Sequence, residues 1–237
     1  MLFPMSSTVP PTPLSKLPNF DPRSVPVVGV DHHLPPVPTG SLHPQAIRQR
    51  FLTPPNWQPE FREEPKWANR LPVPASVLIP VVLRDRPTVL LTQRTSHLSS
   101  HSGQIAFPGG KQDSDDADLV ATALREAQEE VGLQPEFVQI LGTLPVYVTG
   151  SAYIITPVVG LVREGFSLTP NAFEVEHVFE VPLDFLMDPA NHRRHFLVAD
   201  GVQREWLSMP YVDAGAERFI WGATAGMLRN FYRFLQA

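Results

Sequence analysis

The stretch that decides the fold is FPGGKQDSDDADLVATALREAQEEVGL, Phe107–Leu133. Its second half predicts an amphipathic helix over Ala117–Val131, because apolar residues recur there at helical spacing. At about 100° per residue, Glu126, Glu129 and Glu130 share one arc of this helix, beside its apolar stripe. Six residues form the stripe: Leu119, Val120, Ala123, Leu124, Ala127 and Val131. Three carboxylates are therefore expected at the edge of a buried helix face.

Carboxylates at this spacing repel one another by a few tenths of a kcal/mol per pair, and a bound cation would offset that repulsion. Hard oxygen ligands suit Mg²⁺ or Mn²⁺, and a chain without cysteine offers no thiolate for softer metals. Gly109 and Gly110 permit a backbone path that could turn a carbonyl towards the same cation. Two simpler interpretations stay open here: the acids could form a solvated helix face, and the glycines could form only a turn.

The same segment resembles the Nudix box, the signature of the Nudix hydrolase superfamily. That pattern is Gly, five residues, Glu, seven residues, Arg-Glu, an apolar residue, any residue, Glu-Glu, any residue, Gly and an apolar residue. The matching residues are Gly110, Arg125, Glu126, Ala127, Glu129, Glu130, Gly132 and Leu133. Asp116 stands where the first Glu belongs, and eight residues instead of seven separate it from Arg125. We expect the extra residue to bulge the loop before the helix, which leaves Asp116 without the role of that Glu.

The resemblance implies a metal-dependent diphosphate hydrolase. Its metal ligands would be Glu126, Glu129, Glu130 and the backbone carbonyl of Gly110, with Arg125 orienting one glutamate through a salt bridge. The cation, Mg²⁺ or Mn²⁺, would polarise the phosphorus–oxygen bond and lower the pKa of an attacking water.

A carboxylate must remove a proton from the attacking water. One of the box glutamates or a downstream acid, Glu174 or Glu176, is the predicted base. An ordinary exposed loop acid is the alternative interpretation for both downstream residues.

The flanking sequence resembles the coenzyme A diphosphatases within this superfamily. Three stretches carry this likeness: Leu90–Lys111, Leu144–Val162 and Ile220–Leu228. The likeness implies cleavage of CoA or its thioesters into 3',5'-ADP and 4'-phosphopantetheine or its acylated form. The alternatives are a Nudix hydrolase for ADP-ribose, NADH or a dinucleoside polyphosphate, and a Nudix-fold binding module without turnover.

Four residues are the predicted substrate contacts: Arg94, His101, Lys111 and Tyr147. The three basic side chains could meet the diphosphate or the 3'-phosphate, Arg through its bidentate fork. Each also has a structural interpretation, as a surface ion pair, a loop hydrogen bond or a packed ring. Trp206 and Trp221 are expected in the core, away from any ligand.

Proline divides the chain into two parts. Fifteen of the 27 prolines fall in the first 70 residues, where they disfavour helices and central strands. The sequence predicts an extended Pro-rich segment over 1–70, with one short helix near Pro44–Phe51, and a Nudix hydrolase domain over 71–237. This segment could cover its own domain or stabilise a homodimer.

The predicted domain has a mixed β-sheet between helices, an α+β fold of the α/β/α sandwich type, because strands and helices interleave without regular βαβ spacing. Ser114–Asp116 can cap the first helix, and Gly132 can end it. Asp200-Gly201 predicts a hairpin between two strands, and a last helix should cover Gly222–Leu235. The predicted strands are Ala75–Leu83, Thr88–Gln93, Val138–Leu141, Ile154–Val162, Val178–Val181, Arg193–Ala199 and Gln203–Met209.

Composition narrows the function classes further. A formal charge of −5 argues against a broad nucleic-acid surface, so a small polyanion would have to meet a few placed cationic groups or bound metal. The chain has no cysteine, which excludes disulfides and fits a cytoplasmic protein. No apolar stretch is long enough to span a membrane, and we read no secretory signal.

Overall fold

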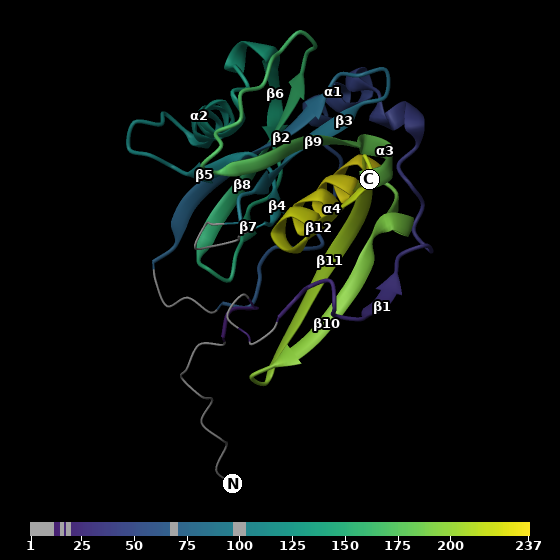
Figure 1. The fold of residues 1–237 in the computed structure, drawn as a ribbon. Helices are drawn as coiled ribbons and strands as arrows, with labels where there is room; N and C mark the ends of the chain where they lie inside the picture. The colour runs from purple at the N-terminus through teal and green to yellow at the C-terminus, as the bar shows by residue number, and fades with distance from the viewer. Residues whose placement is uncertain (1–11, 15–16, 18–19, 67–70, 97–102) are drawn as a thin grey trace.

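A computed structural model of the chain describes residues 12–14, 17, 20–66, 71–96 and 103–237. Within these residues the strands form two sheets, of eight and four strands, with helices packed against them (Figure 1). The described strands are β1 Val27–Val30, β2 Val73–Val82, β3 Thr88–Arg94, β4 Ile105–Ala106, β5 Gly109–Lys111, β6 Val138–Thr143, β7 Tyr147–Val148, β8 Tyr153–Val162, β9 Val175–Pro182, β10 Arg193–Ala199, β11 Val202–Asp213 and β12 Ala216–Trp221. The described helices are α1 Pro44–Leu52, α2 Leu119–Val131, α3 Leu183–Leu186 and α4 Gly222–Gln236, with 3₁₀ helices η2 Thr39–Leu42, η3 Pro135–Phe137 and η4 Pro189–Asn191.

The larger sheet is mixed and has helices on both faces. Its strands follow the order β4-β3-β2-β8-β6, and β2 runs parallel to β8 while the other pairs are antiparallel. Successive residues of β2 point to opposite faces. Leu78 and Val82 pack in a core with residues of α2, whereas Ile79 and Val81 pack in a second core with residues of α1 and α4. The predicted sandwich with a mixed sheet between helices is confirmed.

The smaller sheet has the order β1-β10-β11-β12, and all of its neighbours are antiparallel. The predicted Asp200-Gly201 hairpin is confirmed, because both residues have positive φ angles, 53° and 71°, and join paired strands. β11 continues to Asp213, four residues beyond its predicted end, and turns into β12, which the sequence patterns missed.

Much of the chain before residue 71 packs against the rest of the fold. The predicted short helix is confirmed as α1, and Ile47 on this helix is fully buried in the core. β1, which was not predicted, pairs with β10 at the edge of the smaller sheet. An edge position tolerates nearby proline, since only one side of an edge strand needs hydrogen-bond donors.

The carboxylate helix begins two residues later than predicted. Asp118 caps α2, because its Oδ1 accepts hydrogen bonds from the amides of Val120 and Ala121 at 2.9 and 2.8 Å. The expected cap at Ser114–Asp116 is wrong, and Asp116 is instead engaged by Arg125. Gly132 ends the helix as predicted, with a left-handed φ of 75°.

A buried charge network ties the N-terminal segment to α4 and β10. Arg229 of α4 is 1% exposed, and it contacts Asp31 at 3.1 Å, Glu60 at 2.6 Å and His192 at 3.0 Å. Arg194 of β10 contacts both acids from the other side. The buried pair of Arg229 and Asp31 is thereby linked to the partly exposed Glu60 and Arg194, and loss of one buried charge would leave the other poorly compensated, which is costly.

His192 predicts a fall in stability in mild acid. Burial, and then the charge of Arg229, lowers the pKa of His192 to about 4 from 6.5. Between these values the unfolded chain takes up a proton that the folded chain refuses, so the free energy of unfolding falls as the pH drops from 6.5 towards 4. The fall is expected to reach about 3 kcal/mol and to be absent above pH 6.5.

Urea unfolding at pH 7.0 and 4.5 measures this contribution. His192→Gln should lose less stability between the two pH values than the wild type. His32→Gln, which changes an exposed imidazole, should keep the wild-type difference. Equal pH dependence in the wild type and His192→Gln would contradict the assignment.

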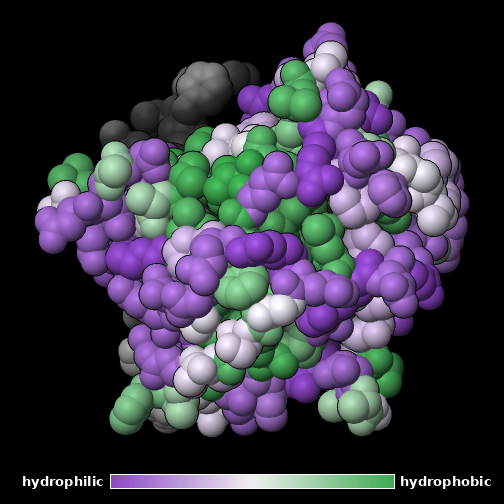
Figure 2. All heavy atoms as spheres, turned by 90° about the horizontal axis from the view of Figure 1, so that it is seen from above, coloured by the Kyte–Doolittle hydropathy of each residue, from purple (hydrophilic) through white to green (hydrophobic). Residues whose placement is uncertain are grey.

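The described surface is mixed in character. Seen from above, it is mostly hydrophilic, with hydrophobic side chains gathered near the middle of the face (Figure 2). Among the described helices, none combines the length and the apolar composition needed to cross a bilayer.

Candidate active site

The acidic side of α2 faces the glycine strand β5. β5 pairs with β2, which sets Gly109 opposite Val77 and Gly110 opposite Ser76. A Cβ atom added to Gly110 would lie 2.4 Å from Glu126 Oε1, and one added to Gly109 would lie 2.4 Å from the carbonyl oxygen of Ser76. At Gly109 a side chain would meet backbone atoms, so the strand requires glycine there, and at Gly110 a side chain would displace the Glu126 carboxylate from the main chain.

Glu130 lies inside the protein beside the same strand. Its side chain is 5% exposed, its Oε2 accepts the Gly109 amide hydrogen at 3.3 Å, and its Oε1 lies 3.6 Å from Arg94 Nη1. Burial raises the pKa of Glu130 to about 8, with Arg94 opposing and the charges of Glu126 and Glu174 reinforcing the rise. Arg94 alone does not compensate the charge of the buried Glu130 carboxylate, so a second cation bound beside it would be favourable.

Arg125 organises the outer half of the site. Its guanidinium donates to both carboxylate oxygens of Asp116, and its Nη1 donates to Glu126 Oε1 at 3.0 Å and to Glu129 Oε2 at 2.9 Å. The hydrogen bonds from Arg125 hold the pKa of Asp116 well below its usual range. Asp116 therefore fixes Arg125, a role that the displaced spacing in the sequence concealed.

The remaining predicted acids lie at different depths. Glu129 is 59% exposed and pairs with Arg125, while Glu176 is exposed on β9. Glu174 is half-buried, and the Asn171 side chain contacts its Oε1 at 3.5 Å. Burial raises the pKa of Glu126, and the charges of Glu129 and Glu174 add to that effect against Arg125. The structure therefore couples Glu174 electrostatically to two of the box glutamates.

The donor set around β5 fits a hard divalent cation. It consists of carboxylate oxygens that repel one another and of main-chain groups that only glycine can bring this close. Among the described residues, no three carboxylate or imidazole groups already stand at the mutual spacing of a formed metal site. Arg125 holds Glu129 in the present arrangement, so closure around an ion would require that carboxylate to turn inward.

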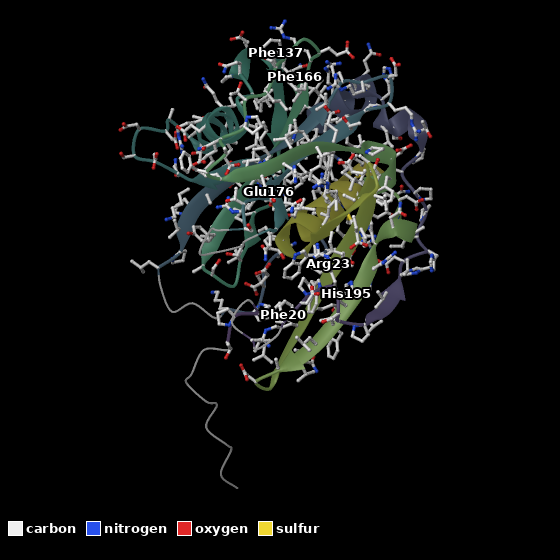
Figure 3. All side chains as sticks on the ribbon, viewed as in Figure 1. Phe20, Arg23, Phe137, Phe166, Glu176 and His195 are labelled. Atoms are coloured by element: carbon white, nitrogen blue, oxygen red, sulfur yellow. The ribbon has the colours of Figure 1, made fainter. Side chains whose placement is uncertain are left out.

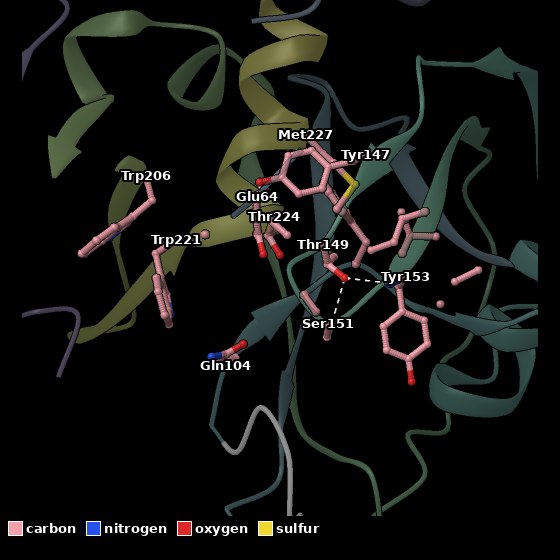
Figure 4. A pocket seen from close by; sticks show the side chains of 18 of the residues that line it. Glu64, Gln104, Tyr147, Thr149, Ser151, Tyr153, Trp206, Trp221, Thr224 and Met227 are labelled. Carbon is pink, nitrogen blue, oxygen red and sulfur yellow. Dashed lines mark hydrogen bonds between the residues drawn. The ribbon is translucent and has the colours of Figure 1, made fainter. Parts of the chain in front are cut away.

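A cavity of about 420 Å³ opens beside the glycine strand and extends under α4 (Figure 4). Of the predicted substrate contacts, Arg94, Lys111 and Tyr147 line it, and His101 lies outside the described residues. Arg94 is partly neutralised by Glu130, whereas Lys111 is exposed. The cavity and the carboxylates thus share Gly109 and Gly110 as a common wall.

Glu64 is a site residue that the sequence patterns missed. It accepts a hydrogen bond from the Tyr147 hydroxyl at 3.1 Å and another from the Gly150 amide at 3.0 Å. The Tyr147 ring packs so closely on α4 that a Cβ at Gly226 would lie 2.9 Å from it. Glu64 and Tyr147 are 83 residues apart, so no local spacing relates them.

Comparisons with known proteins agree with this architecture. The family model of the NUDIX domain matches residues 72–201. An uncharacterized Nudix hydrolase NudL of Yersinia pestis is 41% identical over 156 residues, which are 66% of this chain and 76% of the relative, and NudL of Yersinia pseudotuberculosis matches equally.

Similar solved structures include a C. elegans Ap4A hydrolase, with 18% identity and a TM-score of 0.40 over 46% of this chain and 80% of that one. The NUDIX domain of Shewanella oneidensis NrtR, complexed with ADP ribose, has 21% identity and a TM-score of 0.38 over 57% and 82%.

The family model and the NudL relatives give the class of this protein as a Nudix diphosphatase, and the carboxylates beside the glycine strand fit the divalent cations that such enzymes generally use. The chain belongs to the Nudix hydrolase family.

Proposed function

We propose that this protein hydrolyses the diphosphate bond of CoA or of its thioesters, giving 3',5'-ADP and 4'-phosphopantetheine or its acylated form. One observation carries the proposal. The three stretches whose sequences resemble the CoA diphosphatases all contribute walls to the cavity beside the carboxylates: Arg94 and Gln104 come from the first, Tyr147 and Thr149 from the second, and Met227 from the third. A shared cavity is what a common substrate-recognition function would require.

The proposed roles follow from position. Glu126, Glu129, Glu130 and the carbonyl of Gly110 would hold the divalent cation, which is Mg²⁺ or Mn²⁺. When bound, such an ion neutralises diphosphate charge and lowers the pKa of a nearby water. Glu174, half-buried and coupled to Glu126 and Glu130, is the proposed base that takes a proton from the attacking water.

The remaining roles concern the substrate. Arg94 and Lys111 would bind and orient the diphosphate from the cavity wall. The water oxygen bonds to one phosphorus atom, the bridging oxygen leaves with the other phosphate, and the proton passes to the carboxylate.

A substrate panel tests the proposal. The purified protein is incubated with Mg²⁺ or Mn²⁺ and, separately, with CoA, acetyl-CoA, ADP-ribose, NADH and a dinucleoside polyphosphate, and the products are weighed by mass spectrometry. The expected result is 3',5'-ADP from the two CoA compounds, a highest kcat/KM for one of them, and loss of turnover with EDTA.

Two outcomes would contradict the proposal. Preferred cleavage of ADP-ribose, NADH or the dinucleoside would assign another substrate to the same chemistry. Calorimetric binding of CoA without hydrolysis at saturating metal would identify a binding module.

A further inference from the structure

The wall of the cavity opposite β8 is formed by the smaller sheet. Arg204 and Trp206, two residues apart on β11, and Trp221 at the end of β12 all line the cavity. Figure 4 shows the two indoles on one side of the pocket and Tyr153 on the other. All three wall residues lie beyond residue 201, where the match to the family model ends. This wall is therefore a feature of the present chain's C-terminal part.

The two tryptophans differ in how deeply they are buried. Trp206 is 6% exposed and stacks on His195, with ring centroids 5.6 Å apart and planes 7° from parallel. The edge-on ring of Phe20 also supports it, at 6.1 Å, and Figure 3 shows Phe20 and His195 together beside β10. Trp221 meets Trp206 edge-on at 6.2 Å but is only half-buried. Phe20 also meets Trp221, at 6.0 Å, so a buried indole and a shared phenyl ring support a second, more accessible indole at the cavity.

One buried donor in this wall has no hydrogen-bond partner among the described residues. Trp206 Nε1 makes no hydrogen bond with any described residue, although the atom is buried. Buried indole nitrogens normally find an acceptor. An acceptor on a bound molecule would satisfy it.

Arg204 adds a buried positive charge to the same wall. It is 5% exposed, and its guanidinium donates to two carbonyl oxygens, those of Ala199 at 2.8 Å and Thr12 at 2.7 Å. It forms no ion pair with a described residue, although its charge acts at longer range on the Asp200 carboxylate, which accepts from the Thr12 amide. Arg94, the other arginine of the cavity, is by contrast paired with Glu130. A buried guanidinium whose nearby carboxylate is not in ion-pair contact favours a bound anion.

We propose that this wall binds the nucleotide end of the substrate, with the heterocycle against the indole of Trp221 and a phosphate monoester on Arg204. The inference rests on the proposed function, since it is the adenosine 3'-phosphate of CoA that offers a heterocycle and a monoester together. An acyl chain could use the indoles but would leave the Arg204 charge without a partner. The opposite side of the cavity, at Gly109–Lys111, then receives the diphosphate.

Binding of reaction products tests the wall without turnover. Titration with 3',5'-ADP and with 5'-AMP is followed by calorimetry and by tryptophan fluorescence. Trp221→Leu should weaken the binding of both nucleotides by about 10-fold or more, because the base of each loses its stacking surface. Arg204→Met should weaken 3',5'-ADP by about 10-fold or more and leave 5'-AMP nearly unchanged, because only the former carries the 3'-phosphate.

Matched variants keep the test interpretable. Arg193→Met removes an exposed arginine of β10 and should bind both nucleotides as the wild type does. Trp221→Phe should restore much of the binding that Trp221→Leu loses. If Arg204→Met does not fold, Arg204→Lys retains the charge without the planar fork and should still weaken 3',5'-ADP selectively.

The outcomes separate this inference from the proposed function. If the wild type hydrolyses CoA and Arg204→Met keeps the same preference for CoA over dephospho-CoA, the nucleotide-binding role of this wall is wrong, while the proposed function is supported. If the protein binds 3',5'-ADP through Arg204 but does not cleave CoA, the nucleotide-binding role of the wall is supported and the proposed function is wrong. A Trp221→Leu variant that binds both nucleotides normally, but whose KM changes only for long acyl chains, would assign the wall to the thioester and overturn the inference.

Discussion

Glu126→Gln is expected to lower kcat/KM by about 10²–10⁴-fold, because a cation that contributes several kcal/mol to the transition state would lose a charged ligand. The Glu126 carboxylate lies against Gly110, and the negative charges of Glu129 and Glu174 repel it. Glutamine keeps the shape of the side chain and removes the charge that the repulsion acts on. The measurement is steady-state hydrolysis of CoA at several Mg²⁺ and Mn²⁺ concentrations.

Stability should not fall with activity in this variant. Burial raises the pKa of Glu126, so the folded protein already disfavours its charged form. A neutral amide should therefore leave the melting temperature equal to that of the wild type or above it. A catalytic loss with a lower melting temperature would instead indicate damage to the fold.

Two further substitutions serve as a control and as a second test of the metal ligands. Glu136→Gln removes an exposed acid just beyond α2 and should keep wild-type turnover. Glu129→Gln tests whether the outer carboxylate joins the site, and we expect a loss of similar size. Near-normal turnover in Glu126→Gln would contradict its assignment as a ligand.

Local pattern predicted the carboxylate helix well. The apolar repeat and Gly132 placed α2 and its C-terminal end, and the Asp200-Gly201 pair placed a hairpin, because each signal acts within a few residues. The start of α2 was predicted wrongly because several acids compete for one cap. Asp118 has the geometry to cap the helix, while the bidentate attraction of Arg125 takes Asp116 away.

Long-range pairing could not be predicted in this way. β1 gains its hydrogen bonds from β10, more than 160 residues later, and its proline-rich surroundings disfavoured only a central strand, so they gave no signal for this edge strand. Glu64 and Arg204 likewise acquire their roles from partners far along the chain. Such contacts depend on how the two sheets meet, and no residue spacing encodes that. Trp206 is buried as predicted, whereas Trp221 is only half-buried, and both also line the cavity, which the sequence did not predict.

The buried charge network gives the largest expected effect on stability. Arg229→Met should lower the free energy of unfolding by about 3–5 kcal/mol, because Asp31 and Glu60 would then share only Arg194. At about 2–4 °C per kcal/mol for a chain of this size, the melting temperature should fall by about 6–20 °C. Chemical denaturation at pH 7 measures the change.

A control and a double variant show that charge, and not packing alone, is responsible. Arg233→Met, an exposed change on the same helix, should stay within about 0.5 kcal/mol of the wild type. The double variant Asp31→Asn/Arg229→Met should lose less free energy of unfolding than the sum of the two single variants. Asp31→Asn removes the carboxylate charge that Arg229→Met leaves without its partner. Because Asp31 and Glu60 belong to the first 70 residues, Arg229→Met should also expose that segment to early proteolysis. A loss of stability no larger than that of Arg233→Met would mean that the network does not fasten the N-terminal segment to α4.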